Sequence, residues 1–177
     1  INISSIEHNV KEVVRRASEI GIDIAGVIKG TTGDIEVAKA YDRGGARWIA
    51  SSRLEQIRGA IDAGIKKPML LIRISMLSEV PEVVELCDYS LQSELVVIEA
   101  LNREAKAQGK IHNVILMADM GDLREGFWDK EEMAEVALRI EHEMENIHLA
   151  GIGTNVGCYG SILPTKEKLE ELVEVAI

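Results

Sequence analysis

The sequence predicts an α/β protein of the TIM-type (β/α)8 barrel class, with about six of the eight strand–helix units present. Strand-like apolar runs alternate with amphipathic helical segments along the whole chain. The apolar runs are nearly continuous, which indicates strands covered on both faces. No G-x-G-x-x-G follows the first run, which disfavours a doubly wound dinucleotide-binding sheet. Because no linker-like segment interrupts the alternation, we expect residues 1–177 to form one partial barrel domain without a second domain.

Capping patterns and helical spacing of apolar residues predict the helices. The S-x-x-E pattern begins at Ser4 and again at Ser52, and Asp129 and Thr165 precede later helices. Glycines close several of these segments, as expected of residues that adopt left-handed backbone conformations readily. The predicted helices cover approximately residues 4–20, 34–42, 52–63, 80–86, 95–108, 129–144 and 165–176.

Runs rich in valine, isoleucine and leucine predict the strands. They cover residues 22–29, 47–50, 69–74, 88–91, 114–119 and 147–153. In barrels of this class the chemistry lies at the carboxyl ends of the strands. The polar residues at these ends include several cations and hydroxyls in an acidic chain, which points to an anionic ligand such as a phosphate or carboxylate. The alternative is that strand ends are polar because loops face water. The candidates at this edge are Lys29, Ser51, Ser52, Arg53, Arg73, Ser90, Gln92, Ser93, Asp119, Arg124, Thr154 and Asn155.

Lys29 is the candidate with the most specific chemistry. It ends the first apolar run and precedes a glycine-bracketed loop, Gly30 to Gly33. A rigid, partly desolvated position at the barrel mouth would favour loss of a proton from its amine and attack on a carbonyl. The sequence therefore predicts a Schiff-base lysine, although most lysines are solvated surface charges.

Two loops carry the remaining signals. In DMGDLREG (residues 119–126), Gly121 permits a sharp turn that would let Arg124 reach back over the mouth and donate to a phenolate or carboxylate. A local Asp119–Arg124 ion pair that shapes the loop is equally compatible with the sequence. GIGTNVGCYG (residues 151–160) could cradle an anion or a flat cofactor, or simply be an irregular loop, and it lacks the Walker lysine.

Composition excludes several other classes. A net charge of −10 and a pI of about 4.9 argue against nucleic acid as a partner. The apolar runs are far shorter than the roughly 20 residues of a membrane helix, and no signal peptide is visible. The two cysteines have no metal or disulfide spacing, Cys87 reads as a small core residue, and the four histidines form no metal set. We therefore expect a cytoplasmic protein without a metal.

The chain resembles the N-terminal domain of amino-acid racemases of the alanine racemase type, and most closely the ornithine racemase-like branch. The similarity covers nearly the whole chain. The segments that carry it are VIKG with GD (27–30, 33–34), SR (52–53), LLIRISMLSEV (70–80), SLQSEL (90–95), MADMGDLREG (117–126) and GIGTNVGCYG (151–160).

The resemblance implies a pyridoxal 5'-phosphate (PLP) barrel of fold type III and assigns roles within it. Lys29 would hold PLP as an internal aldimine and act as one catalytic acid/base. The implied cofactor-binding residues are Lys29, Arg124, Asn155, Ser52, Arg73 and Thr154. Arg124 falls where relatives place an arginine near the cofactor phenolate, and Asn155 falls where they carry a ring-stacking histidine. Met117 replaces a lysine of many alanine racemases, and Ser51 and Ser75 replace residues frequent in the branch.

The implied reaction interconverts L- and D-amino acids, of ornithine or alanine type, by removal and return of the α-proton. Relatives supply the second acid/base, a tyrosine, from a C-terminal domain and often from the partner subunit of a homodimer. We therefore expect this chain to be a fragment, truncated at both ends and weakly active or inactive alone. The alternatives are a non-catalytic PLP-binding homeostasis barrel and a barrel enzyme without PLP in which Lys29 is incidental.

Overall fold

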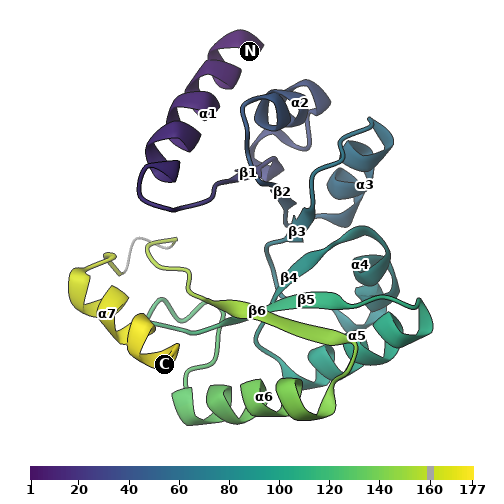
Figure 1. Ribbon diagram of the computed structural model, residues 1–177, viewed down its shortest axis with the longest axis vertical. Coiled ribbons are helices and arrows are strands. Elements are labelled where there is room, and N and C mark those ends of the chain that lie inside the picture. Colours follow the sequence, from purple (N-terminus) through teal and green to yellow (C-terminus); the bar gives the residue numbers. More distant parts are fainter. Residues whose placement is uncertain (159–161) are drawn as a thin grey trace. The chain divides into compact units, whose positions relative to one another are not determined.

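The computed structural model describes residues 1–158 and 162–177 (Figure 1). By contact density the chain divides into two compact units. The first comprises Ile1–Ile72 with Leu86–Asp88, and the second comprises Arg73–Glu85 with Tyr89–Ile177. Each unit has its own strands and helices and is described by itself.

The first unit contains three parallel strands in the order β1 (Ala25–Val27), β2 (Trp48–Ser51) and β3 (Met69–Leu71). Parallel pairing requires long crossovers, which the helices provide. The connecting segments are η1 (Lys29–Thr31), α2 (Ile35–Arg43) and α3 (Leu54–Asp62), and α1 (Ile3–Ser18) precedes the first strand and packs beside α2. The fully buried side chains include Ile28, Val37, Ile49, Ile57 and Leu71.

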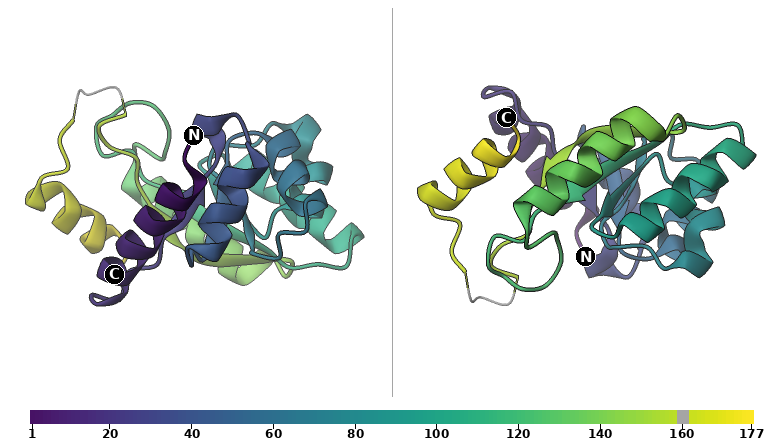
Figure 2. Two further views of the ribbon diagram at one scale, coloured as in Figure 1. Left: turned by 90° about the horizontal axis from the view of Figure 1, so that it is seen from above. Right: turned by 90° about the horizontal axis from the view of Figure 1, so that it is seen from below.

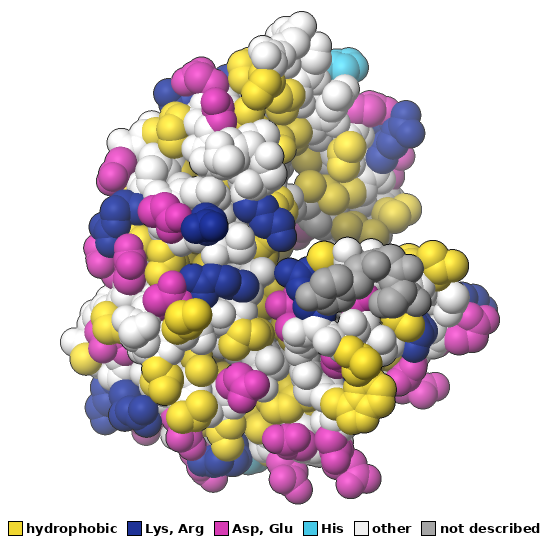
Figure 3. All heavy atoms as spheres, turned by 180° about the vertical axis from the view of Figure 1, so that it is seen from behind, with side chains coloured by type: hydrophobic (Ala, Val, Ile, Leu, Met, Phe, Trp, Pro, Cys, Tyr) yellow, Lys and Arg dark blue, Asp and Glu magenta, His cyan; other side chains and the backbone are white. Residues whose placement is uncertain are grey.

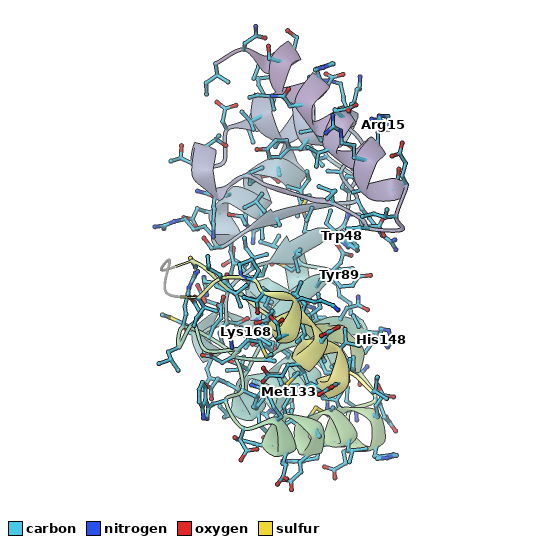
Figure 4. All side chains as sticks on the ribbon, turned by 90° about the vertical axis from the view of Figure 1, so that its left-hand side faces the viewer. Arg15, Trp48, Tyr89, Met133, His148 and Lys168 are labelled. Carbon is cyan, nitrogen blue, oxygen red and sulfur yellow. The ribbon has the colours of Figure 1, made fainter. Side chains whose placement is uncertain are left out.

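The second unit repeats this plan with β4 (Tyr89–Gln92), β5 (His112–Met117) and β6 (Ile147–Gly153), again parallel and in chain order. Figure 2 shows α5 (Leu95–Ala107) and α6 (Lys130–Glu143) side by side over one face of these strands. Met133 of α6, labelled in Figure 4, is buried in this layer, and His148 of β6 is exposed. The remaining elements are η2 (Leu77–Glu79), α4 (Val80–Leu86) and α7 (Lys166–Val175).

The helix starts confirm part of the predicted capping. The Asp129 carboxylate accepts from the backbone N–H groups of Glu131 and Glu132, and the Thr165 hydroxyl accepts from Lys168 N–H. The predicted caps at Ser4 and Ser52 are wrong. Asn2 caps α1, because its side-chain oxygen accepts from Ser5 N–H and also from the Ser4 hydroxyl. Arg53 is the N-cap position of α3, because the Ser51 hydroxyl accepts its N–H and draws the chain into a turn.

Two predicted strands are shorter than expected. Residues 22–24 lie outside β1, and residues 72–74 lie outside β3, although Ile72 N–H still donates to the Ser51 carbonyl at 3.0 Å. At the end of β1 the chain curls into η1, because the Gly33 N–H returns to the Ile28 carbonyl at 3.0 Å. The runs of apolar residues therefore extend past the hydrogen-bonded ladders, into an exposed stretch at residues 22–23 and a half-buried one at residues 72–74. Periodicity alone does not distinguish such extensions from strand.

The exposed surface mixes charges of both signs. On the face drawn in Figure 3, lysine and arginine side chains are interspersed with aspartate and glutamate. Among the described helices, none has both the length and the apolar character needed to cross a membrane. No three histidine, cysteine, aspartate or glutamate side chains of residues 1–158 and 162–177 gather into a potential metal site.

Candidate active site

Lys29 is the first residue of η1 and lies just beyond the carboxyl end of β1. The Ile28 N–H donates to the Ala50 carbonyl at 2.9 Å, which anchors the turn to β2. Thr32 then adopts a left-handed conformation with φ +53°, which bends the chain back toward α2. The backbone of Lys29 is therefore fixed at the predicted edge, but its side chain is exposed, so the expected partial desolvation is not seen. The reason is local: the side chain leaves from a surface turn instead of from the strand.

The β2 end of the same unit presents two serines. Ser51 is fully buried, donates to Gln56 Oε1 at 2.7 Å and accepts from Arg53 N–H. Ser51 is therefore committed to shaping the turn into α3. Ser52, the predicted cofactor-binding residue, is half-buried directly after the strand. Its place at the carboxyl edge agrees with the prediction, and its role as a ligand of the cofactor stays a prediction.

In the second unit, two strand-end loops meet. The loop after β5 carries Arg124 and Glu125, and the segment after β6 carries Asn155 and Cys158 (Figure 2). The Asn155 amide donates to Glu125 Oε1 at 2.8 Å, and the Arg124 guanidinium contacts the Cys158 sulfur. Arg124 and Asn155 are both among the predicted cofactor-binding residues, and the structure brings their loops together. Tyr159 and Gly160 of the glycine-rich segment lie outside the described residues.

The conformation of residues 119–126 resolves the alternative of an Asp119–Arg124 ion pair. The Asp119 carboxylate accepts from the N–H groups of Gly121 at 2.8 Å and Leu123 at 3.1 Å, so it organises backbone. Asp119 is nearly buried, whereas Arg124 is exposed. Gly121 turns with φ +109°, as predicted, and Leu123 follows with φ +53°. Asp119 therefore shapes the backbone of the loop, and Arg124 lies exposed on it with its guanidinium against the Cys158 sulfur.

Thr154 and Asn155 follow β6 directly. The Thr154 hydroxyl oxygen is buried and makes no hydrogen bond within the part of the chain that the structure describes. A buried hydroxyl without a partner is costly and marks a place where a ligand or water accepts or donates. Thr154 therefore fits its predicted role as a polar contact of a bound group.

Arg73 forms hydrogen bonds within the protein that the sequence did not predict. Its guanidinium binds Glu79 through two hydrogen bonds of 2.6 and 2.8 Å and also donates to the Ile74 carbonyl at 3.1 Å. The Glu79 carboxylate also accepts a hydrogen bond from the Met76 backbone N–H at 3.1 Å. Arg73 thus fixes the chain that enters η2, and its predicted contact with a cofactor stays a prediction.

We expect Glu79→Gln to destabilise the protein by about 1–2 kcal/mol near pH 7. The hydrogen bond from Arg73 holds the pKa of Glu79 below the ordinary value of 4.5, against the opposing effect of burial. A lowered folded-state pKa stabilises the fold above the unfolded value, and this contribution is lost as the pH falls through the folded-state pKa. Urea unfolding at neutral and acidic pH measures the difference. The control is Glu135→Gln, which changes an exposed glutamate of α6. If the two variants lowered the free energy of unfolding equally near pH 7, the stabilising role of the Arg73–Glu79 pair would be contradicted.

Sequence reasoning missed two groups that organise this edge. Glu125 is the partner of Asn155, thirty residues away in the chain, and no local pattern signals such a pairing. Lys130 donates from its amine to three backbone carbonyls at the two ends of the Arg124 loop, those of Asp119, Phe127 and Trp128. Its only sequence signal is its position one residue after the Asp129 cap. Partial burial lowers the pKa of Lys130, while nearby Asp119, Glu171 and Asp129 act in the opposite direction.

These features define a class of protein: a parallel α/β scaffold with polar and charged side chains at the carboxyl ends of the strands of each unit. They are an exposed amine in the first unit, and an exposed guanidinium and a buried hydroxyl in the second. The family described as "Alanine racemase, N-terminal domain" matches residues 1–176, and the chain belongs to this family. The lysine racemase of Thermotoga maritima is 40% identical over 99% of this chain and 48% of its own length. The ornithine racemase of Acetoanaerobium sticklandii is 36% identical over 99% of this chain and 49% of its own length.

Solved structures show the same fold. An alanine racemase from Streptomyces coelicolor A3(2) superposes with a TM-score of 0.82 at 22% identity, covering 99% of this chain and 49% of that one. An alanine racemase from E. faecalis gives a TM-score of 0.81 at 22% identity, with the same coverage. The predicted barrel class is thereby confirmed. The chain spans about half the length of the relatives it matches.

Proposed function

We propose that this chain is the cofactor-binding part of a PLP-dependent racemase that acts on an amino acid with a basic side chain. The observation that carries the proposal is the meeting of the Arg124 and Asn155 loops, in a family whose similar members are named lysine and ornithine racemase. We extend the proposal to a homodimeric full-length protein, as the family resemblance implies, and to a cytoplasmic location, as the cysteine pattern suggests.

Each unit offers residues whose chemistry fits the cofactor. PLP has an aldehyde that condenses with an amine, a phenolate that accepts hydrogen bonds, and a phosphate that favours hydroxyl and cationic donors. Lys29 offers an exposed amine at the end of β1, and Arg124 offers an exposed planar fork. Thr154 offers a buried hydroxyl that lacks a partner in the described chain. When bound, PLP delocalises the charge left at the α-carbon after proton loss.

In the proposed reaction each of these side chains would have a different role. Lys29 Nζ holds the cofactor and carries the α-proton on one face, because its amine is the only predicted acid/base in this set. Racemisation requires a second acid/base on the opposite face. Arg124 neutralises an anionic oxygen, and its permanent charge makes it a donor that does not compete for the proton. Asn155 keeps the two loops together through Glu125.

The substrate class is supported by a cavity in the second unit. It has a volume of about 390 Å³, and carboxylates, the Arg124 loop and apolar side chains line it together. Glu94 and Glu125 could receive the terminal ammonium of lysine or ornithine, while Leu123 and Trp128 offer apolar surface to its methylene stem. Glu79 binds the Arg73 guanidinium and is not one of these carboxylates.

The full-length protein loaded with PLP tests the proposal directly. We expect the protein to racemise L-lysine or L-ornithine, with alanine as a poorer substrate. Chiral chromatography of the products measures the reaction. Failure to racemise any of these three amino acids, in a preparation that has bound PLP, would contradict the proposed activity.

Glu94→Gln tests the substrate class separately. We expect the variant to raise KM for the basic substrate by about 3- to 10-fold and to leave KM for alanine unchanged, because an exposed carboxylate–ammonium contact contributes modestly. Glu135→Gln, which removes an exposed carboxylate of α6 outside the cavity, is the matched control. An equal change in KM for both substrates would show that Glu94 does not select the side chain.

A further inference from the structure

The loop that presents Arg124 is closed at a narrow neck. The Phe127 N–H donates to the Met117 carbonyl at 2.7 Å, and the Asp119 N–H donates to the Phe127 carbonyl at 3.0 Å. At Gly126, with φ +118°, an added Cβ would lie 2.4 Å from the Asp119 nitrogen, so a side chain does not fit there. The two ends of the loop are therefore in direct contact, and residues 119–126 form a compact loop between β5 and α6.

Lys130 ties this neck from outside the loop. Its Nζ donates to the carbonyls of Asp119 at 2.5 Å, Phe127 at 2.8 Å and Trp128 at 3.2 Å. The first carbonyl lies where the loop begins and the other two lie where it ends. An ammonium has three N–H donors, and here all three are used. One side chain thus joins both ends of the loop.

A lysine suits this position better than other residues. An arginine fork is planar and cannot converge on three carbonyls from one nitrogen, and an apolar side chain would leave those carbonyls without a donor. Partial burial lowers the pKa of Lys130 and Lys168 adds to that effect, while Asp119, Asp129 and Glu171 counteract it only in part. The charged groups from the loop, α6 and α7 therefore largely support a protonated amine.

We propose that Lys130 is a positioning residue: by joining the two ends of residues 119–126, it fixes the Arg124 guanidinium and the Glu125 carboxylate against the segment after β6. The loop contacts that depend on it are those of Arg124 with Cys158 and of Glu125 with Asn155. The catalytic consequence rests on the proposed function, whereas the ordering of the loop does not.

The experiment compares Lys130→Met, Lys130→Arg and the control Lys106→Met in the full-length protein. Lys106 is an exposed lysine in the last turn of α5. Hydrogen exchange is measured on peptides that cover residues 118–130, without PLP and with it. We expect loop amides in Lys130→Met to exchange at least about tenfold faster than in the parent, with Lys130→Arg between them and Lys106→Met unchanged.

A double-mutant cycle provides the kinetic readout. We expect Lys130→Met to lower kcat/KM by about 10- to 100-fold, and to cause no further loss when Arg124 is already alanine. If Lys130 had a purely structural role, the loss of kcat/KM in the double variant would equal the product of the losses in the two single variants.

The outcomes separate the two proposals. Unchanged exchange in the loop of Lys130→Met, or multiplicative losses in the cycle, would overturn the role of Lys130. A parent protein without racemase activity would contradict the proposed function and would still leave the exchange test decisive. If Lys130→Met does not fold, exchange in Lys130→Arg decides, because that variant retains the charge and the stem but not the three convergent donors.

Discussion

Replacement of Lys29 by alanine is expected to reduce racemisation by about a thousand-fold or more and to remove the absorbance of covalently bound cofactor. The loss is large because the same amine would both hold the cofactor and carry the substrate proton. The short turn of η1 fixes the Lys29 backbone beside the end of β1, and an exposed side chain of this kind tolerates truncation without disturbing the core. We therefore expect the variant to fold normally and to fail only in cofactor chemistry.

Absorbance spectra, activity and thermal unfolding of Lys29→Ala measure these effects. Lys66→Ala, at another exposed lysine of the same unit, is the matched control and should resemble the parent in all three. Retention of the cofactor band in Lys29→Ala would assign the covalent bond to another amine. A large fall in unfolding temperature would instead show that Lys29 supports the fold.

Arg124→Ala is expected to lower kcat/KM by about 100-fold and to leave the fold intact. The guanidinium is exposed at the tip of a loop whose shape depends on Asp119, so its removal leaves the loop backbone in place. The effect comes from the loss of a permanent, forked donor to an anionic oxygen of cofactor or substrate.

Arg124→Lys separates charge from geometry. It retains the positive charge without the fork, so we expect only partial recovery of kcat/KM relative to Arg124→Ala. Arg103→Ala, an exposed arginine of α5, serves as the control for loss of charge. Steady-state kinetics with the basic substrate make the comparison. Parent-like kinetics in Arg124→Ala would exclude Arg124 from the site.

The fold could be predicted well from the sequence, because the spacing of apolar residues differs between strands and helices. Apolar runs and helical spacing identify each strand and helix, and β6 at Ile147–Gly153 and α4 at Val80–Leu86 agree with the prediction. The ends were less predictable. Ser4 and Asn2 are both good capping residues, and only the geometry of the turn decides that Asn2 accepts the Ser5 N–H. Residues 72–74 continue an apolar run past the end of β3, where they are half-buried and the Ile72 N–H still bonds to β2.

The candidate site was predicted in part. Position at a strand end made Lys29, Arg124, Thr154 and Asn155 candidates, because the parallel strands of each unit direct their carboxyl ends to the same edge of that unit. Their contacts with a cofactor stay predictions. The exposure of Lys29 was not predictable, since it depends on the φ and ψ angles of a short turn. The Glu125–Asn155 bond and the reach of Lys130 depend on contacts between segments distant in the chain. Such contacts follow from packing, for which a single sequence has no local signature.

The most direct measurement is the identity of the lysine that carries the cofactor. Borohydride converts the bond between the PLP aldehyde and a protein amine into a stable secondary amine, and peptide mapping by mass spectrometry locates it. We predict that, in the full-length protein, the phosphopyridoxyl group is found on the peptide that contains Lys29. A label on any other lysine, or no label after loading with PLP, would contradict the account.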